Sequence, residues 1–216
     1  MTKPGREVVF EDQLFRVEHQ PVDGRAMPYV FVTRIGAVTI LPIIQRPAET
    51  PQALVIQNKR LYYGTSVGLP GGNIDGGFER PERPALTAER ELLEETGYGY
   101  SWPGDRNIDV FRLRNLSNTI DYPRFFAVMR GVDYVGGEDN NPHEIVTCRP
   151  MPLDEYVDPL FELDRGEMYP EVNAAFARAE RRLGREAAMS WLLAERVPQA
   201  ADVPQAFAPW LLPAAA

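Results

Sequence analysis

The stretch from residue 69 to 98, LPGGNIDGGFERPERPALTAERELLEETGY, constrains the fold most, because it joins a glycine-rich loop to an amphipathic helix. Pro84 suits a first helical turn, and Gly97 suits the position just past a helix end. At about 100° per residue, the charged side chains near the end share one side of this helix: Arg90, Glu91, Glu94 and Glu95. The apolar ones share the other: Ala85, Leu86, Ala88, Leu92 and Leu93. We expect the apolar face to pack on a sheet.

The carboxylates of this helix are crowded in a way that favours cation binding. Glu91 lies three and four residues before Glu94 and Glu95, so the three side chains are neighbours. The helix dipole also disfavours negative charge at a C-terminus, and each such effect costs about 0.2 to 1 kcal/mol. A hard divalent cation such as Mg²⁺ or Mn²⁺ would turn the repulsion into a site. Charge alone leaves a solvated acidic face as the alternative.

The order of predicted elements indicates a mixed α/β fold with a mixed sheet between helices. Apolar runs with strand patterns come before and after the central helix: 6–22, 29–35, 36–43, 53–60, 108–116, 124–132 and 144–151. A segment rich in Ala, Arg and Glu from about residue 170 predicts a C-terminal helix. We divide the chain into an N-terminal strand extension, a main domain and a Pro/Ala-rich tail: 1–35, 36–196 and 197–216. Trp210, Leu211 and Leu212 indicate that the tail docks, on this subunit or on a neighbour.

Charge and composition narrow the functional classes. The net charge of −8 argues against nonspecific binding to a nucleic acid backbone. Cys148 is the only cysteine, which excludes an intrachain disulfide and a cysteine zinc cluster, and we expect it in the core. The N-terminus lacks the apolar run of a signal peptide, and no stretch is long enough to span a bilayer. We therefore expect a cytoplasmic protein.

A long spaced motif gives the helix a specific meaning. It reads Gly76, five residues, Glu82, seven residues, Arg90-Glu91-Leu92, one residue, Glu94-Glu95, one residue and Gly97. This pattern resembles the Nudix box, the signature of the Nudix hydrolase family. The box normally ends on an aliphatic residue, and here Tyr98 stands there.

The resemblance implies a fold, a reaction and a set of site residues. The Nudix fold is an α/β/α sandwich around a mixed sheet, and its enzymes hydrolyse a nucleoside diphosphate linked to another group. By position, the implied metal ligands are Glu91, Glu94, Glu95 and the backbone carbonyl of Gly72. Arg90 and Glu82 match the pair that orients the metal-binding glutamates. Mg²⁺ is the implied cofactor, with Mn²⁺ as the alternative.

The front of the box departs from the family. There the Pro-Gly-Gly turn usually supplies the first glycine of the box, but here Pro70-Gly71-Gly72 lies four residues too early and Gly76 satisfies the count. We interpret this as a four-residue insertion within 73–82. The insertion leaves the helix intact and leaves the loop path and the role of Gly76 open.

The flanks resemble the ADP-ribose and nucleotide-sugar pyrophosphatase branch of the family. Arg60, in ALVIQNKR, matches a substrate-contacting arginine of that branch, with a surface arginine as the alternative. Gly68 stands where a glutamate is usual, and the Ser-Pro-Gly expected after Leu113 is missing. The resemblance as a whole favours ADP-ribose or a nucleotide sugar, and these two departures count against ADP-ribose itself. Hydrolysis of a nucleoside triphosphate or a non-nucleotide diphosphate, and an inactive Nudix ligand-binding module, stay open.

The same resemblance gives several candidates for the general base and an expectation for the oligomeric state. Carboxylates in or beside the loop 136–144 are candidates for the base, as is Glu95 on the helix: Glu138, Asp139 and Glu144. His143 is expected to be a solvated or capping residue. In this branch an N-terminal strand extension commonly serves dimerisation, so we expect a homodimer.

Overall fold

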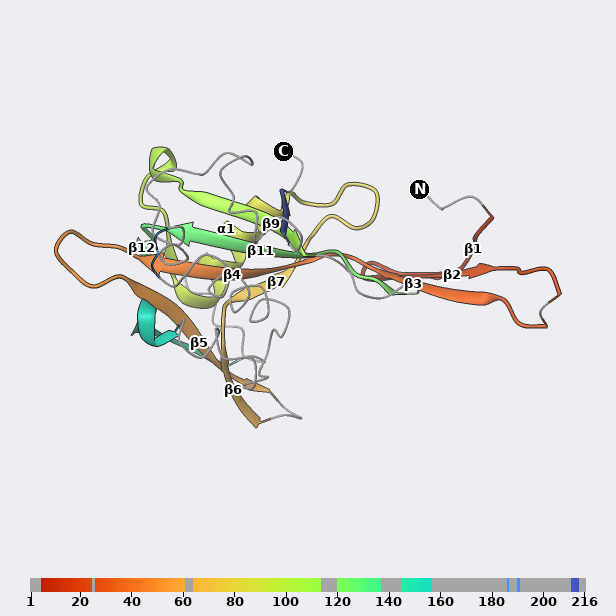
Figure 1. The fold of residues 1–216 in the computed structure, drawn as a ribbon, viewed down its shortest axis with the longest axis horizontal. Coiled ribbons are helices and arrows are strands. Elements are labelled where there is room, and N and C mark those ends of the chain that lie inside the picture. Colours follow the sequence, from red (N-terminus) through yellow and green to blue (C-terminus); the bar gives the residue numbers. More distant parts are fainter. Residues whose placement is uncertain are drawn as a thin grey trace.

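A mixed sheet forms the body of the protein in the computed structural model, which describes residues 5–24, 26–60, 64–113, 120–136, 145–156, 186, 190 and 211–213. Its main strands run in the order β13-β5-β4-β11-β9-β14 (Figure 1). Their bounds are Ile145–Pro152 for β13, Gln52–Arg60 for β5, Ala37–Ile44 for β4, Arg124–Arg130 for β11, Ile108–Leu113 for β9 and Leu211–Pro213 for β14. β4 and β11 are parallel and the other neighbours are antiparallel, which confirms the predicted mixed sheet.

One edge of β4 is shared by two strands. Near its end, Ile43 and Ile44 pair with β5, whereas its first three residues pair with the short strand β7, Gly71–Asn73. Between them β6, Gly64–Gly68, pairs with β5. β7 therefore enters the sheet beside the start of β4 and carries the Gly-Gly turn to the helix.

The helix α1, Pro84–Thr96, follows as its sequence predicts. Gly97 ends it in the left-handed conformation, with φ of 70°, and its N–H donates to the carbonyl of Leu93. Ala88 and Leu92 are fully buried on the sheet. They join a core of aliphatic residues from β4, β5 and β11: Val38, Ile40, Ile44, Leu54, Ala127 and Met129. Cys148 packs against this core, as expected.

The buried face of α1 is rotated relative to the prediction. Leu86 is 40% exposed, so its assignment to the packed face is wrong, whereas Thr87 and Thr96 are fully buried. Thr96 is tolerated there because its hydroxyl donates to the carbonyl of Leu92. The rotation turns Glu91 toward β7, and its side chain is only 15% exposed. The carboxylate of Glu91 thus lies between the helix and the sheet.

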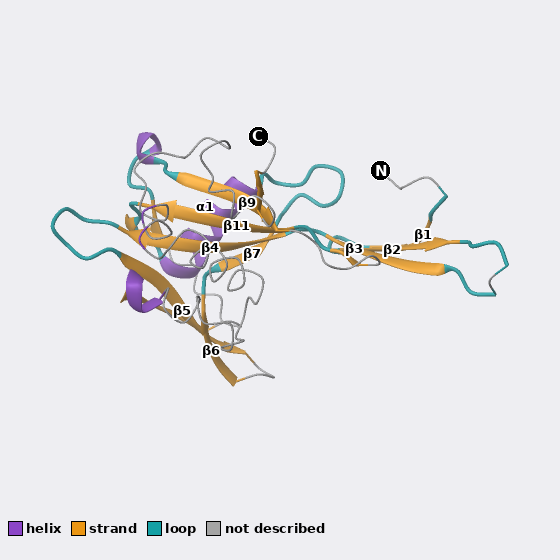
Figure 2. Cartoon of the chain, viewed as in Figure 1, coloured by secondary structure: helices purple, strands orange, loops and turns teal. Residues whose placement is uncertain are grey.

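An arm of antiparallel strands projects from the body (Figures 1 and 2). It consists of β1 (Glu7–Glu11), β2 (Phe15–Gln20) and β3 (Tyr29–Arg34), with β10 (Ile120–Asp121) parallel to β3. Every residue of β1 is exposed. The arm exposes several large apolar side chains: Val8, Val9, Phe10, Tyr29, Val30 and Ile120. The sheet therefore lacks a covering layer within the part of the chain that is described.

Two smaller elements and the tail complete the described fold. β8 (Tyr98–Gly99) pairs with β12 (Asp133–Tyr134), and a 3₁₀ turn spans Pro103–Asp105. β14 pairs with the edge strand β9, so the predicted docking of the tail occurs on this subunit. Of the predicted C-terminal helix only Glu186 and Ser190 are described, both in helical conformation, and Trp210 falls outside the described residues. None of the helices described is long and apolar enough to cross a membrane.

Candidate active site

The insertion in 73–82 forms a closed excursion that leaves the site intact. The N–H of Glu82 donates to the carbonyl of Asp75 at 2.7 Å, so the chain between them leaves and returns at nearly one point. Gly76 has a φ of 89°, and a Cβ there would overlap the carbonyl oxygen of Arg80. Gly76 is thus the turn residue of the excursion.

Arg90 is the centre of the site. Its guanidinium pairs with four carboxylates at 2.9 to 3.2 Å: Asp75, Glu82, Glu91 and Glu94. Its Nη2 also donates to the carbonyl of Asn73 at 3.2 Å. Burial lowers the pKa of Arg90, but the hydrogen bond to Glu82 and the surrounding carboxylates outweigh this and raise it. One fixed positive charge therefore faces four negative ones, and the cluster stays anionic.

Glu82 contacts Arg90, the partner that its position in the motif implies. It accepts hydrogen bonds from Arg90 at 3.2 Å and from the hydroxyl of Thr87 at 2.8 Å. Thr87 is buried in the first turns of α1, which fixes one end of the interaction. The predicted pair of Arg90 and Glu82 is therefore in contact, and it ties the helix to the loop.

Glu91 lies against the backbone of Gly72. A Cβ added to Gly72 would overlap the Glu91 carboxylate, so only glycine leaves room for it. Burial raises the pKa of Glu91, and the charge and hydrogen bond of Arg90 oppose that rise without cancelling it. Glu91 is thus a carboxylate held in a partly dry position beside a main-chain segment.

Glu95 is fixed by the neighbouring glycine. Its Oε2 accepts a hydrogen bond from the N–H of Gly71 at 2.8 Å. A Cβ at Gly71 would overlap the carbonyl oxygen of Val38, so β7 approaches β4 too closely for a side chain. The two glycines therefore bring the sheet within reach of two carboxylates of α1.

The carboxylate and carbonyl oxygens of the site suit a hard divalent cation. In this structure, however, the glutamates accept hydrogen bonds from Arg90 and Gly71. Within the described ranges, no group of three or more His, Cys, Asp or Glu side chains is arranged around a common metal position. The oxygens of Glu91 and Glu94 instead share Nη1 of Arg90. Glu94 is 43% exposed and has room to rotate away from it. Carboxylate and carbonyl oxygens are the ligands that Mg²⁺ and Mn²⁺ prefer.

A comparison with known protein families decides the assignment of this site. Residues 33–172, more than half of the chain, match the model of the NUDIX domain. The chain belongs to the Nudix family. The match contains α1, the loop before it and the Gly-Gly turn, so the arrangement around Arg90 is the Nudix box of this protein. It is accordingly a Nudix hydrolase.

Two similar proteins support the family and the fold. A CMP-5'-(N-acetyl-N-hydroxy-3-aminopropyl)phosphonate hydrolase from Streptomyces rubellomurinus (strain ATCC 31215) is 30% identical over 157 residues, covering 70% of this chain and 69% of the relative. The solved structure of an ADP compounds hydrolase matches with a TM-score of 0.53 at 19% identity, covering 85% of this chain and 96% of that one. The second likeness concerns the fold alone.

The structure does not describe the side chains of the other predicted site residues of this Nudix hydrolase. Arg60 ends β5, but its side chain is not among those described. Glu138, Asp139, His143 and Glu144 fall outside the described residues. Their assigned roles stay predictions.

Sequence reasoning missed two residues that contact Arg90. Asp75 forms an ion pair with it at 3.2 Å, and Asn73 offers its main-chain carbonyl. Neither belongs to a fixed position of the motif. The Gly-Gly turn was the feature of the sequence that could have indicated both residues. The residues that follow this turn run past the end of the helix that carries Arg90.

Proposed function

We propose that this Nudix hydrolase uses a divalent metal ion, Mg²⁺ or alternatively Mn²⁺, to hydrolyse the P–O–P link between a nucleoside monophosphate and a second phosphoryl or phosphonyl group. The observation that carries this proposal is the anionic cluster around Arg90, packed against the glycine backbone of β7. Enzymes of the Nudix family generally depend on a divalent metal ion. An anionic substrate cannot approach such a cluster unless cations first neutralise it.

The proposed roles follow from where each group is held. Glu91, Glu94 and the carbonyl of Gly72 are the proposed metal ligands, and Arg90 with Glu82 keeps the glutamates oriented. A bound divalent ion would neutralise the diphosphate and lower the pKa of a water. Glu95, whose oxygen already accepts the Gly71 N–H, is a ligand or the base that takes a proton from that water.

Loop carboxylates are the alternative base. Glu138 and Glu144 lie in or beside the polar loop 136–144, whose sequence position suits closure over a substrate. The pH dependence of kcat in Glu95→Gln separates the two cases. Loss of the acidic limb with a collapse in kcat supports Glu95 as the base, and an unchanged limb supports the loop.

ADP-ribose or a nucleotide sugar is the favoured substrate, and a CMP-linked phosphonate is the second candidate. The resemblance of the flanks to the ADP-ribose and nucleotide-sugar branch supports the first. The 30% identity to the CMP-phosphonate hydrolase supports the second. Both place a nucleoside monophosphate on one side of the reacting link. Arg60 is proposed to contact the phosphate or ribose oxygens, because a guanidinium binds such oxygens in a bidentate way.

A substrate panel tests this function. Purified protein is incubated with ADP-ribose, nucleotide sugars, a CMP-linked phosphonate, nucleoside triphosphates and prenyl diphosphates, each with Mg²⁺, Mn²⁺ or EDTA. Release of a nucleoside monophosphate, followed by ³¹P NMR, is expected only with metal. Preference for triphosphates or prenyl diphosphates would contradict the proposed substrate class. No turnover of any compound would support an inactive binding module instead.

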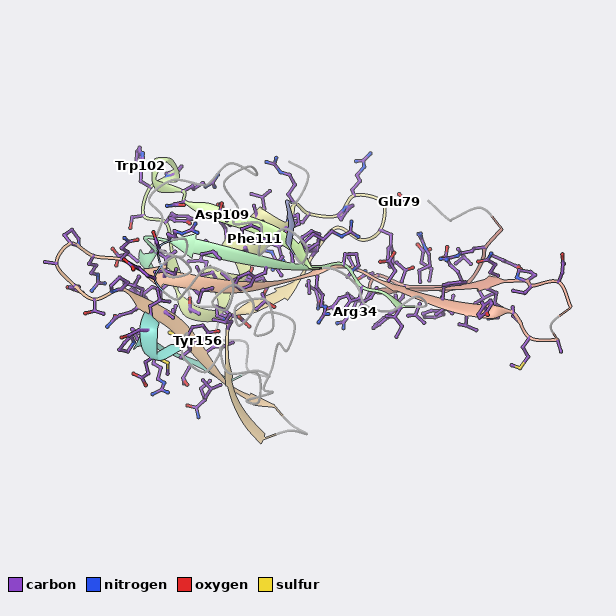
Figure 3. All side chains as sticks on the ribbon, in the orientation of Figure 1. Arg34, Glu79, Trp102, Asp109, Phe111 and Tyr156 are labelled. Atoms are coloured by element: carbon purple, nitrogen blue, oxygen red, sulfur yellow. The ribbon has the colours of Figure 1, made fainter. Side chains whose placement is uncertain are left out.

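The arm supports a second proposal, that the protein is a homodimer through β1–β3. Its apolar side chains are exposed on a thin sheet, and such a surface is typical of an interface. Phe10→Asp is expected to shift the mass measured by light scattering from dimer to monomer. Trp102→Asp is the matched control, since Trp102 is also exposed but lies at the far end of the body from the arm (Figure 3). A wild-type monomer would contradict this proposal. A cytoplasmic location stays a prediction from the sequence.

A further inference from the structure

Arg34 lies where the arm joins the body, at the end of β3 (Figure 3). Its guanidinium carbon is 5.3 Å from the ring centre of Phe15 and 4.7 Å from that of Tyr122. Its Nη2 donates to the side-chain oxygen of Asn73 at 3.3 Å. One side chain thus joins β2, the segment between β10 and β11, and β7.

Asn73 is held by two arginines. Its side chain accepts from Arg34, and its main-chain carbonyl accepts from Arg90. Asn73 directly follows Gly72, whose backbone lies against the Glu91 carboxylate. β7 has only three residues, so few ladder bonds fix it and side-chain contacts have a large share in setting its position.

Arg34 has a buried hydrogen-bond donor without a partner, and such a donor lowers the stability of the folded protein. Among the described residues, two buried side-chain nitrogens lack a hydrogen-bond partner, and they are Nε of Arg34 and Nε of Arg90. A buried unsatisfied donor costs about 1 to 3 kcal/mol. A methionine at position 34 would pack between the same two rings without that cost. The two arginines that hold Asn73 therefore both carry an unsatisfied donor, which is expected where geometry serves a site.

We propose that Arg34 is a positioning residue for metal binding. By holding Asn73 it fixes β7, so that the backbone of Gly72 stays against the Glu91 carboxylate, and these two groups would hold the ion. This inference rests on the proposed function, because it assigns Arg34 to the same metal site. It also links the arm to that site, since Phe15 of β2 packs on the guanidinium.

Three variants and a matched control test the inference. Arg34→Met keeps the packing volume and removes the hydrogen bond, Arg34→Lys keeps the charge without the planar fork, and Asn73→Ala removes the acceptor. Arg6→Met is the control, because Arg6 also lies over an aromatic ring, Phe31, at 3.5 Å, and pairs with Glu18 on the arm. The measurements are the Kd of Mn²⁺ by electron paramagnetic resonance, kcat and KM, and Tm without metal.

The expected result is a split between these readouts. Arg34→Met is expected to weaken Mn²⁺ binding and lower kcat by about 10- to 100-fold, as an atomic displacement of about 1 Å does. KM at saturating metal and Tm without metal are expected to stay close to wild type. Arg34→Lys should recover part of the Mn²⁺ affinity, and Arg6→Met should match wild type. The double variant of Arg34→Met and Asn73→Ala should lose no more than Arg34→Met alone.

Several outcomes overturn the inference. Wild-type Mn²⁺ affinity in Arg34→Met, additive losses in the double variant, or a fall in Tm that accounts for the lost binding would each do so. If Arg34→Met does not fold, Asn73→Ala with wild-type Mn²⁺ affinity overturns it independently. If both wild type and Arg34→Met bind Mn²⁺ and turn over substrate equally well, this inference is contradicted and the proposed function is not. A wild-type protein that binds no Mn²⁺ contradicts the proposed function as well.

Discussion

Arg90 and Arg130 are both bound to carboxylates, yet their surroundings differ in charge balance and exposure. Arg130 is 1% exposed and donates to Asp109, itself 6% exposed, at 2.8 Å. Its Nη1 also donates to the amide oxygen of Asn107 at 3.4 Å. Arg90 is 27% exposed and faces four carboxylates, of which Asp75 is 69% exposed. The first arrangement is buried, and the second is anionic and open to solvent.

The difference separates a structural ion pair from a binding site. A buried pair must be balanced, because an uncompensated charge in the interior is costly. The Arg90 cluster has more carboxylates than one guanidinium can neutralise, and exposure lets solvent or added cations supply the rest. Charge excess next to a glycine backbone, rather than the presence of an ion pair, is therefore the sign of function here.

Glu94→Gln gives the largest expected effect on this contrast. It removes one charge from the open cluster, and we expect kcat to fall by about 10³-fold or more, because electrostatic and metal contributions of this kind dominate phosphoryl chemistry. Tm should change little, since Glu94 is 43% exposed. Steady-state kinetics with Mg²⁺ and a thermal melt measure both. Near-full Mg²⁺-dependent activity in this variant would remove Glu94 from the metal ligands.

Asp109→Asn is expected to lower the stability of the protein and to leave kcat unchanged, the reverse of Glu94→Gln. It removes the Asp109 charge from a buried pair with Arg130, and breaking a buried pair costs about 3 to 5 kcal/mol of unfolding free energy. The kcat of the folded fraction should be unchanged. Urea denaturation measures the loss, and Asp133→Asn is the control, because its pair with Arg46 is half exposed and solvent screens it. Equal stability of the two variants would mean that the buried pair has no special weight.

Gly72→Ala sharpens the comparison at the glycine backbone. The new Cβ would overlap the Glu91 carboxylate and displace it. We expect kcat to fall by about 10- to 100-fold. Gly99→Ala is the matched control, because among the described residues a Cβ there meets only Val135, at an ordinary 3.5 Å. Equal activities of the two variants would show that Glu91 does not need its place against Gly72.

The smallest expected effect is a pH dependence of metal stabilisation. Burial raises the pKa of Glu91, so without metal the folded protein keeps this proton to higher pH than the unfolded chain does. The stability that neutral Glu91 provides is present at low pH and is lost as pH rises through its raised pKa. Added Mg²⁺ should therefore raise Tm more at pH 7 than at pH 5. Glu91→Gln should abolish this difference, and a Mg²⁺ effect independent of pH in wild type would contradict the assignment.

The sequence predicted the parts of this molecule that local patterns control. The helix limits at Pro84 and Gly97, the mixed sheet and the contact of Arg90 with Glu82 were all predictable. The helix limits and the mixed sheet depend on spacing within one segment or on strand propensity, whereas the contact of Arg90 with Glu82 was implied by the resemblance to the Nudix box. Leu86 was placed on the wrong face because helical periodicity gives the width of an apolar stripe but not which edge of it meets the sheet.

The residues that were missed come together only through tertiary structure. Arg34 and Asn73 are 39 residues apart and meet because β7 enters the sheet beside β4. Asp109 and Arg130 face each other across β9 and β11. No local pattern reports such pairs. The interpretation of 73–82 as an insertion stays a prediction, and the Asp75–Glu82 hydrogen bond shows that this segment closes on itself.

Anomalous diffraction from crystals soaked in Mn²⁺ tests most directly whether the anionic cluster around Arg90 is a metal site. The account predicts a peak at bonding distance from Glu94, Glu91 and the Gly72 carbonyl, with Glu94 turned away from Arg90. Crystals of Glu94→Gln should show a weaker peak or none. A wild-type map without a peak at this position under saturating Mn²⁺ would contradict the central claim.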